Sequence, residues 1–115
     1  MVGNNDPITL YRVAKKFPPA ESDYLSHQAR GRVPPDDASE QELRSWDALS
    51  AWETAALARE IADRFRSAKW IVRYVIPATA AGVTYEPSPP PGHYDPRGDV
   101  EELKEYLDTD FKVEV

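Results

Sequence analysis

Residues 43–65 read LRSWDALSAWETAALAREIADRF and decide the fold. One interpretation is a single helix, in which five apolar side chains share a face because helical residues are about 100° apart. These are Leu43, Trp46, Leu57, Ile61 and Phe65. Trp52 would then lie roughly opposite Ile61 and stay exposed, although the alanine-rich composition supports a continuous helix.

The other interpretation is a helix, a strand and a second helix. Residues 46, 48, 50 and 52 would alternate onto one side of the strand, and a new helix would begin near Glu53 or Thr54. We expect this interrupted form, because a large apolar side chain such as Trp52 gains more from burial than from contact with water.

Strands are expected on both sides of this stretch. Ile8–Val13 (ITLYRV) is rich in β-branched and aromatic residues, and Trp70–Ile76 (WIVRYVI) is apolar on almost both faces, which is typical of a central strand. Val83–Tyr85 predicts a short strand, and Asp110–Val115 alternates like a half-exposed strand near an edge. We expect the first, second and last of these to hydrogen-bond side by side in one sheet.

Short helices are expected between the strands. Glu21–Arg30 follows a pair of prolines and precedes a glycine, which is typical of a short helix, and Tyr24 and Leu25 are expected to face inward. Capping boxes at residues 39–42 and 99–102 predict the starts of two more helices, because the first side chain of each box accepts from the third backbone amide.

Length and composition indicate one domain. The chain has 115 residues, 41% hydrophobic and 30% charged, which is enough for one core and too apolar for wholesale disorder. Its 11 prolines are clustered and mark element boundaries, because proline lacks an N–H donor. We predict a single compact α+β domain over residues 1–115, with a small mixed or antiparallel sheet and three to four short helices packed on it. Residues 1–7 are expected to be flexible, and residues 86–98 to form a Pro-rich loop.

Charge and residue usage exclude several partners. The net charge is −6, and residues 95–115 carry eight acidic and three basic residues. Because an acidic surface repels phosphate, duplex nucleic acid is not an expected partner. The acidic end is either a patch for a basic partner or an ordinary solvated face. No apolar run is long enough to cross a membrane and there is no cysteine, so we expect a soluble, cytoplasmic protein without disulfides.

Familiar catalytic and metal motifs are absent from the sequence. The two histidines, His27 and His93, are sixty-six positions apart, so no metal site is predicted. There is no glycine-rich phosphate loop and no nucleophile elbow. Ser26 and His27 are adjacent on a predicted helix, where their side chains diverge by about 100° and cannot share a proton.

Two arginines and one polar cluster are the candidates for chemistry. Arg12 and Arg73 each interrupt an apolar strand, where an unpaired buried charge would be unfavourable. In one sheet they could share a polar cleft for phosphate or carboxylate, and the alternative is edge positions or internal salt bridges. A cluster follows the prolines, in a loop where polar groups could converge or where Tyr94 could instead fill the core edge. It consists of His93, Tyr94, Asp95 and Arg97.

Several segments together carry a resemblance to known proteins. They are Leu10-Tyr11-Arg12-Val13, a short helix with Ser26 and Gly31, Trp46–Trp52, and Ile71–Pro77. This pattern resembles a group of small uncharacterised bacterial proteins, and its layout is similar to small ADP-ribosyltransferase-like folds.

The resemblance implies a set of site residues. Arg12, at the end of the first strand, would hold the pyrophosphate or nicotinamide-ribose region of NAD, and the Ser50 hydroxyl would steady a ribose. Arg73 is a further cofactor-binding candidate. A catalytic glutamate would lie on a late strand, for which Glu86 and Glu114 are candidates by location.

Two functions therefore remain open at the level of sequence. The first is a non-catalytic module without a cofactor that binds another protein or a second copy of itself, with Trp46, Trp52 and Trp70 available for packing or contact. The second is an NAD-dependent ADP-ribosyltransferase-like protein that uses Arg12 and Ser50. Whether the chain is an enzyme is left undecided.

Overall fold

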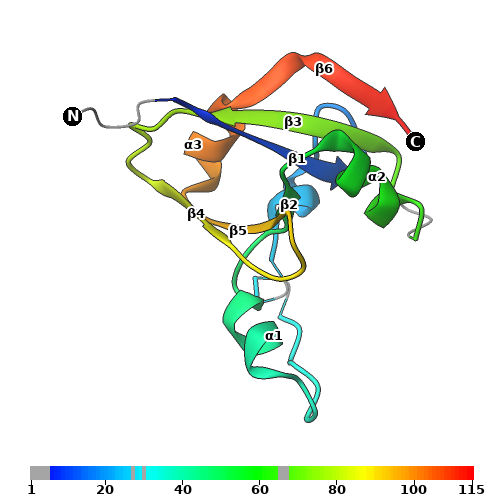
Figure 1. The fold of residues 1–115 in the computed structure, drawn as a ribbon, viewed down its shortest axis with the longest axis vertical. Helices are drawn as coiled ribbons and strands as arrows, with labels where there is room; N and C mark the ends of the chain where they lie inside the picture. Colours follow the sequence, from blue (N-terminus) through cyan, green and yellow to red (C-terminus); the bar gives the residue numbers. More distant parts are fainter. Residues whose placement is uncertain (1–5, 27, 30, 65–67) are drawn as a thin grey trace.

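The computed structural model describes residues 6–26, 28–29, 31–64 and 68–115. Its strands form one antiparallel sheet in the order β4-β5-β2-β1-β3-β6 (Figure 1). The strands are β1 (Ile8–Ala14), β2 (Ala51–Trp52), β3 (Trp70–Ile76), β4 (Val83–Pro87), β5 (His93–Gly98) and β6 (Leu107–Glu114). The predicted α+β class is confirmed, and so is the prediction that β1, β3 and β6 lie side by side.

Three α-helices accompany the sheet in the described part of the chain. They are α1 (Glu40–Ser45), α2 (Ala55–Ala62) and α3 (Val100–Glu105), and a 3-10 turn, η1, covers Glu21–Tyr24. Each α-helix begins after a residue whose side chain accepts from a backbone amide of the first turn: Ser39, Thr54 and Asp99. None of these helices has the length and apolar character that crossing a bilayer requires.

The register of β1 against β3 defines the two faces of the sheet. Arg12 lies opposite Val72, and Tyr11 lies opposite Arg73, so successive residues point to opposite sides. On the side that we call the cleft face, Leu10, Val72 and Tyr74 pack with residues of η1 and α3, whereas the other side is covered by α2. We call that second side the α2 face. Figure 1 shows α1 extending away from the sheet.

The stretch that decides the fold is interrupted, as expected. A helix, a strand and a second helix follow one another, but β2 is only two residues long, and residues 46–48 form a turn. Trp52 is buried on the α2 face with Ala58 and Ile71. A continuous helix would have exposed Trp52, and the Thr54 cap gives the second helix an independent start.

The expectation of a Pro-rich loop over residues 86–98 is wrong in its second half. Residues 93–98 form β5, which pairs with both β4 and β2. Pro96 fits into this strand because its carbonyl still accepts from the amide of Leu49 (3.0 Å). Pairing with the two neighbouring strands, rather than proline content, decides the structure here.

Helix length and orientation also differ from expectation. The helix predicted over 21–30 is only the 3-10 turn η1, which buries Tyr24 but leaves Leu25 exposed. Leu43, which the single-helix interpretation places on an apolar face, is 52% exposed, because α1 extends beyond the sheet and has little to pack against. The last strand, β6, begins at Leu107, three residues before the predicted Asp110. The expectations for residues 1–5, His27, Arg30 and Phe65 fall outside the described residues.

Candidate functional site

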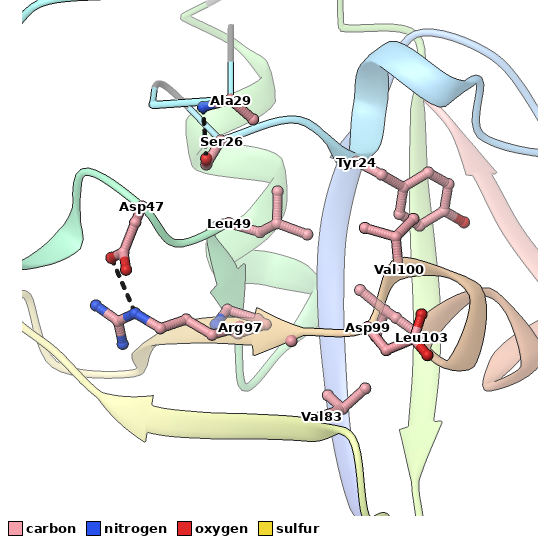
Figure 2. Close-up of a pocket in the computed structure, with 12 residues that line it drawn as sticks. Tyr24, Ser26, Ala29, Asp47, Leu49, Val83, Arg97, Asp99, Val100 and Leu103 are labelled. Atoms are coloured by element: carbon pink, nitrogen blue, oxygen red, sulfur yellow. Dashed lines mark hydrogen bonds and ion pairs between the residues drawn. The ribbon is translucent and has the colours of Figure 1, made fainter. Parts of the chain in front are cut away.

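Two adjoining hollows open on the cleft face. The larger, about 430 Å³, is the arginine lobe. It is lined by Arg12, Leu25, Ser26, Arg32, Glu42, Ser45, Trp46, Ala48, Leu49 and Ser50. The smaller, about 210 Å³, is the small lobe (Figure 2). Ser26 and Leu49 line both hollows, so the two lobes adjoin there, and we call the two together the cleft.

Arg12 forms part of the wall of the arginine lobe. Its side chain projects from β1 onto the cleft face, and the residue is only 8% exposed. Nε donates to the carbonyl of Ser50 (3.0 Å), and Nη2 donates to the carbonyl of Asp23 (2.7 Å). These two bonds fix the guanidinium against the segment before β2 and against η1, so strand, turn and loop are held together at this point.

The positive charge of Arg12 has no anionic partner in the described structure. None of the ion pairs among the described residues involves Arg12. The hydroxyl of Tyr74 donates to that of Tyr24 (2.8 Å), and burial raises the pKa of both phenols, so neither is an anion at neutral pH. A buried cation that is held by carbonyls alone keeps its attraction for an anion.

Ser50 lies next to Arg12, in the segment just before β2. Its carbonyl accepts from Arg12, while the residue itself is exposed and lines the arginine lobe. The opposite wall comes from the end of α1 and from the loop before it, where the indole Nε1 of Trp46 donates to the carbonyl of Arg32 (2.8 Å). The lobe therefore combines two guanidinium groups, several hydroxyls and one aromatic ring.

The small lobe has an apolar interior and a charged rim. Figure 2 shows Tyr24, Leu49, Val83, Val100 and Leu103 converging on it from η1, β4, α3 and the segment before β2. Two carboxylates lie at the rim, those of Asp47 and Asp99. The first accepts from Arg97 Nε (3.0 Å), and the second accepts from the amide of Glu101 (2.9 Å) as the cap of α3.

Arg73 does not share a cleft with Arg12, which corrects the expectation that the two might hold one anion together. The register places Arg73 on the α2 face, where Nε and Nη2 donate to Asp108 (3.0 and 2.6 Å) and the guanidinium lies over the ring of Phe111. The hydrogen bond from Arg73 lowers the pKa of Asp108. The alternative interpretation, an internal salt bridge, is the one that the structure has.

The cluster His93, Tyr94, Asp95 and Arg97 does not converge on one point. Tyr94 packs against Tyr85 of the neighbouring strand β4, and Arg97 pairs with Asp47. The ring of His93 lies 4.6 Å from that of Trp52, so His93 is packed in the fold rather than solvated.

His93 and Asp95 are buried side by side without a hydrogen bond. The Nδ1 of His93 and the Oδ1 of Asp95 are 3.7 Å apart, and neither atom has a partner among the described residues. Burial lowers the pKa of His93. The other carboxylate oxygen accepts from Ser45 Oγ (2.7 Å). Serine therefore contacts aspartate and not histidine, which is not the order that nucleophilic catalysis needs.

The two glutamate candidates lie outside the cleft. Glu86, on β4, lines a different hollow together with Arg44. Glu114, on β6, is exposed at the opposite edge of the sheet. The carboxylate that lines the arginine lobe is that of Glu42, whose Oε1 also accepts from the amide of Ser39 (3.4 Å). In the sequence, Glu42 is the last residue of a capping box, which gives it a structural role. The sequence therefore offers no reason to place Glu42 in a site.

The described residues contain no group of three histidine, aspartate or glutamate side chains that could hold a metal ion. The fold and the cleft define a single-sheet α+β protein with a buried arginine beside an open hollow. Comparison with protein-family models, with curated proteins and with solved structures gave no match.

Proposed function

We propose that this protein binds a nucleotide of the NAD type, with a phosphate at Arg12 and a ribose hydroxyl at Ser50. One observation carries the proposal: Arg12 and Ser50, which the sequence resemblance singles out, line the same hollow, and Arg12 has no anionic partner among the described residues. The lobe volume of about 430 Å³ is in the range of small-molecule sites.

The chemistry of the arginine lobe fits this ligand class. A guanidinium has five N–H donors, and Arg12 gives two of them to the carbonyls of Ser50 and Asp23. The remaining N–H donors can serve a phosphate oxygen in the lobe. Trp46 is half-buried and lines the same lobe.

The proposal covers binding rather than group transfer. Glu86 and Glu114, the glutamates that the resemblance implies for transfer, lie away from both lobes. The carboxylate that does line the arginine lobe, that of Glu42, accepts from the amide of Ser39 in the cap of α1. Binding can be tested on its own.

The test is a titration with NAD, followed by calorimetry and by thermal unfolding. A ligand at 100 times its Kd stabilises the native state by about 2.7 kcal/mol, so NAD is expected to raise the Tm of the wild type. Ser50→Tyr should abolish the rise, because the new ring fills the arginine lobe from an exposed position. Thr79→Tyr, at an exposed site that does not line either lobe, is the control. A Tm that does not change at millimolar NAD would remove the proposal.

A second candidate is a partner-binding module, in which a second copy of the chain or another protein docks on α1 and the loop that precedes it. The supporting observation is the exposure of Val33 and Leu43, at 85% and 52%. Trp52 does not contribute to such a surface, because that side chain is buried. Light scattering over a range of concentrations tests self-association, and Leu43→Asp should prevent it without changing the Tm.

A further inference from the structure

The small lobe is lined by more apolar side chains than its neighbour. Its rim carries the carboxylates of Asp47 and Asp99 and the guanidinium of Arg97, which is paired with Asp47. The arginine lobe is lined by guanidinium groups, hydroxyls and the carboxylate of Glu42. A phosphate is favoured at Arg12, which has no anionic partner among the described residues, whereas the charge of Arg97 at the small lobe is already balanced by Asp47.

An apolar interior with carboxylates at its rim suits a nucleoside. A base is flat and largely apolar on its faces, so it can lie against Leu49 and Val100. Ribose hydroxyls are donors, and an acidic side chain is the usual acceptor for them in dinucleotide sites. Asp99 gives one oxygen to the amide of Glu101, and a carboxylate has acceptor sites on both oxygens.

The two lobes adjoin at Ser26 and Leu49. We propose that the small lobe is a nucleoside subsite and that the whole cleft selects a dinucleotide, with one nucleoside in each lobe and the pyrophosphate at Arg12. This inference rests on the proposed function, because it takes the arginine lobe as the phosphate site.

Ala29→Trp tests the subsite directly. Ala29 is exposed and lines the small lobe, so an indole there blocks the lobe without disturbing the core. We expect the affinity for NAD to fall by roughly tenfold or more, a change of at least 1.4 kcal/mol. The affinity for AMP, which needs only the arginine lobe, should stay the same. Ala56→Trp, at an exposed position on α2, is the matched control and should change neither affinity.

A second variant keeps the test independent of the indole. Asp99→Asn retains a good helix cap but removes the charge. It should weaken NAD binding by a few-fold and leave AMP binding and the Tm unchanged.

The possible outcomes distinguish failure of the nucleoside subsite from failure of the proposed function. Equal affinity of the wild type for NAD and AMP, or unchanged NAD binding in Ala29→Trp, would overturn the subsite while the proposed function stands. A wild type that binds neither nucleotide overturns both. A selective loss of NAD binding in Ala29→Trp supports the subsite.

Discussion

Two arginines lie in similar sequence contexts, but their guanidinium groups have different surroundings in the fold. Arg12 and Arg73 each interrupt an apolar strand, and those strands are neighbours at the centre of the sheet. Arg12 is buried and held by two carbonyls, whereas Arg73 is partly exposed and bonded twice to the carboxylate of Asp108. Arg73 lies opposite the neighbour of Arg12 on β1, so the two arginines project from opposite faces of the sheet.

The difference shows what decides the role of a charged residue in a strand. Arg73 meets an acid from β6, so its charge is balanced within the chain and it stabilises an edge. Arg12 meets only dipoles, so its charge remains available to a ligand. Residue type alone could not separate the two, because the partners come from segments distant in sequence.

Removing the two guanidinium groups should have very different effects on stability. Arg12→Met leaves the carbonyl of Asp23 without a donor in a buried position and that of Ser50 without one in a partly buried position, and a buried loss of this kind typically costs about 1–3 kcal/mol. We expect the free energy of unfolding, measured by urea titration, to fall by about 3 kcal/mol.

Arg73→Met is the matched control for that measurement. Its ion pair is partly exposed to water, so its loss should lower the free energy of unfolding by much less. Equal losses in the two variants would contradict the distinction between a buried structural anchor and a surface pair.

Asp23→Ala should produce the next largest effect, because Asp23 positions one of the acceptors of Arg12. Its carboxylate accepts from the amides of Lys15 (3.2 Å) and Ala20 (3.0 Å), and this holds η1 against the end of β1. Loss of these bonds to a charged acceptor is expected to lower the free energy of unfolding by about 2 kcal/mol.

The readout is urea unfolding together with nucleotide titration. Asp23→Asn, which keeps an acceptor oxygen, should recover about half of the loss. If Asp23→Ala leaves both stability and binding unchanged, Arg12 does not depend on η1 for its position.

The central strands could be predicted from sequence, and the cleft could not. WIVRYVI is apolar on both faces and ITLYRV is rich in β-branched residues, so both strands are fixed by local pattern. The start of α1 follows from its capping box, which is local. In α3 only the first residue of the predicted box acts as expected: Asp99 caps the helix through the amide of Glu101, whereas the carboxylate of Glu102 accepts from the amide of Gly82 and the hydroxyl of Tyr106.

The cleft depends on contacts that no local pattern contains. Ser50 lies thirty-eight residues from Arg12, and Arg97 lies fifty residues from Asp47. The strand at His93–Gly98 was missed because the prolines in and before it predict a loop. Its pairing with β4 and β2 depends on the whole sheet. The faces of Arg12 and Arg73 followed from a one-residue choice of register that the sequence leaves open.

The pH dependence of the two arginine variants should sharpen the comparison. The pKa of Asp108 is lowered in the fold by Arg73, so this pair stabilises the protein above the pKa of the unfolded carboxyl, about 4. That contribution is lost as pH falls through the lowered pKa of the folded state.

The difference in unfolding free energy between wild type and Arg73→Met should therefore shrink in acid. The corresponding difference for Arg12→Met should persist, since carbonyl acceptors do not titrate. Denaturant melts at a series of pH values measure both, and Asp108→Asn should reproduce the acid behaviour of Arg73→Met. A difference that stayed constant for Arg73→Met would mean that the ion pair does not contribute.

His93 provides a third basic group, and the smallest expected effect. It lies beside an acid as Arg73 does, but its Nδ1 is 3.7 Å from Asp95 and unbonded, and burial lowers its pKa. Because the folded state binds the proton less readily than the unfolded state, stability is present above the unfolded pKa, about 6.5, and declines as pH falls below it. His93→Phe keeps the ring beside Trp52 and removes the titrating nitrogen, so its Tm should change less than that of the wild type between pH 7.5 and 5.5, a range on the order of one pH unit either side of 6.5. A wild-type Tm that rises on acidification would mean that protonated His93 closes the gap to Asp95, and would place His93 with Arg73 rather than with Arg12.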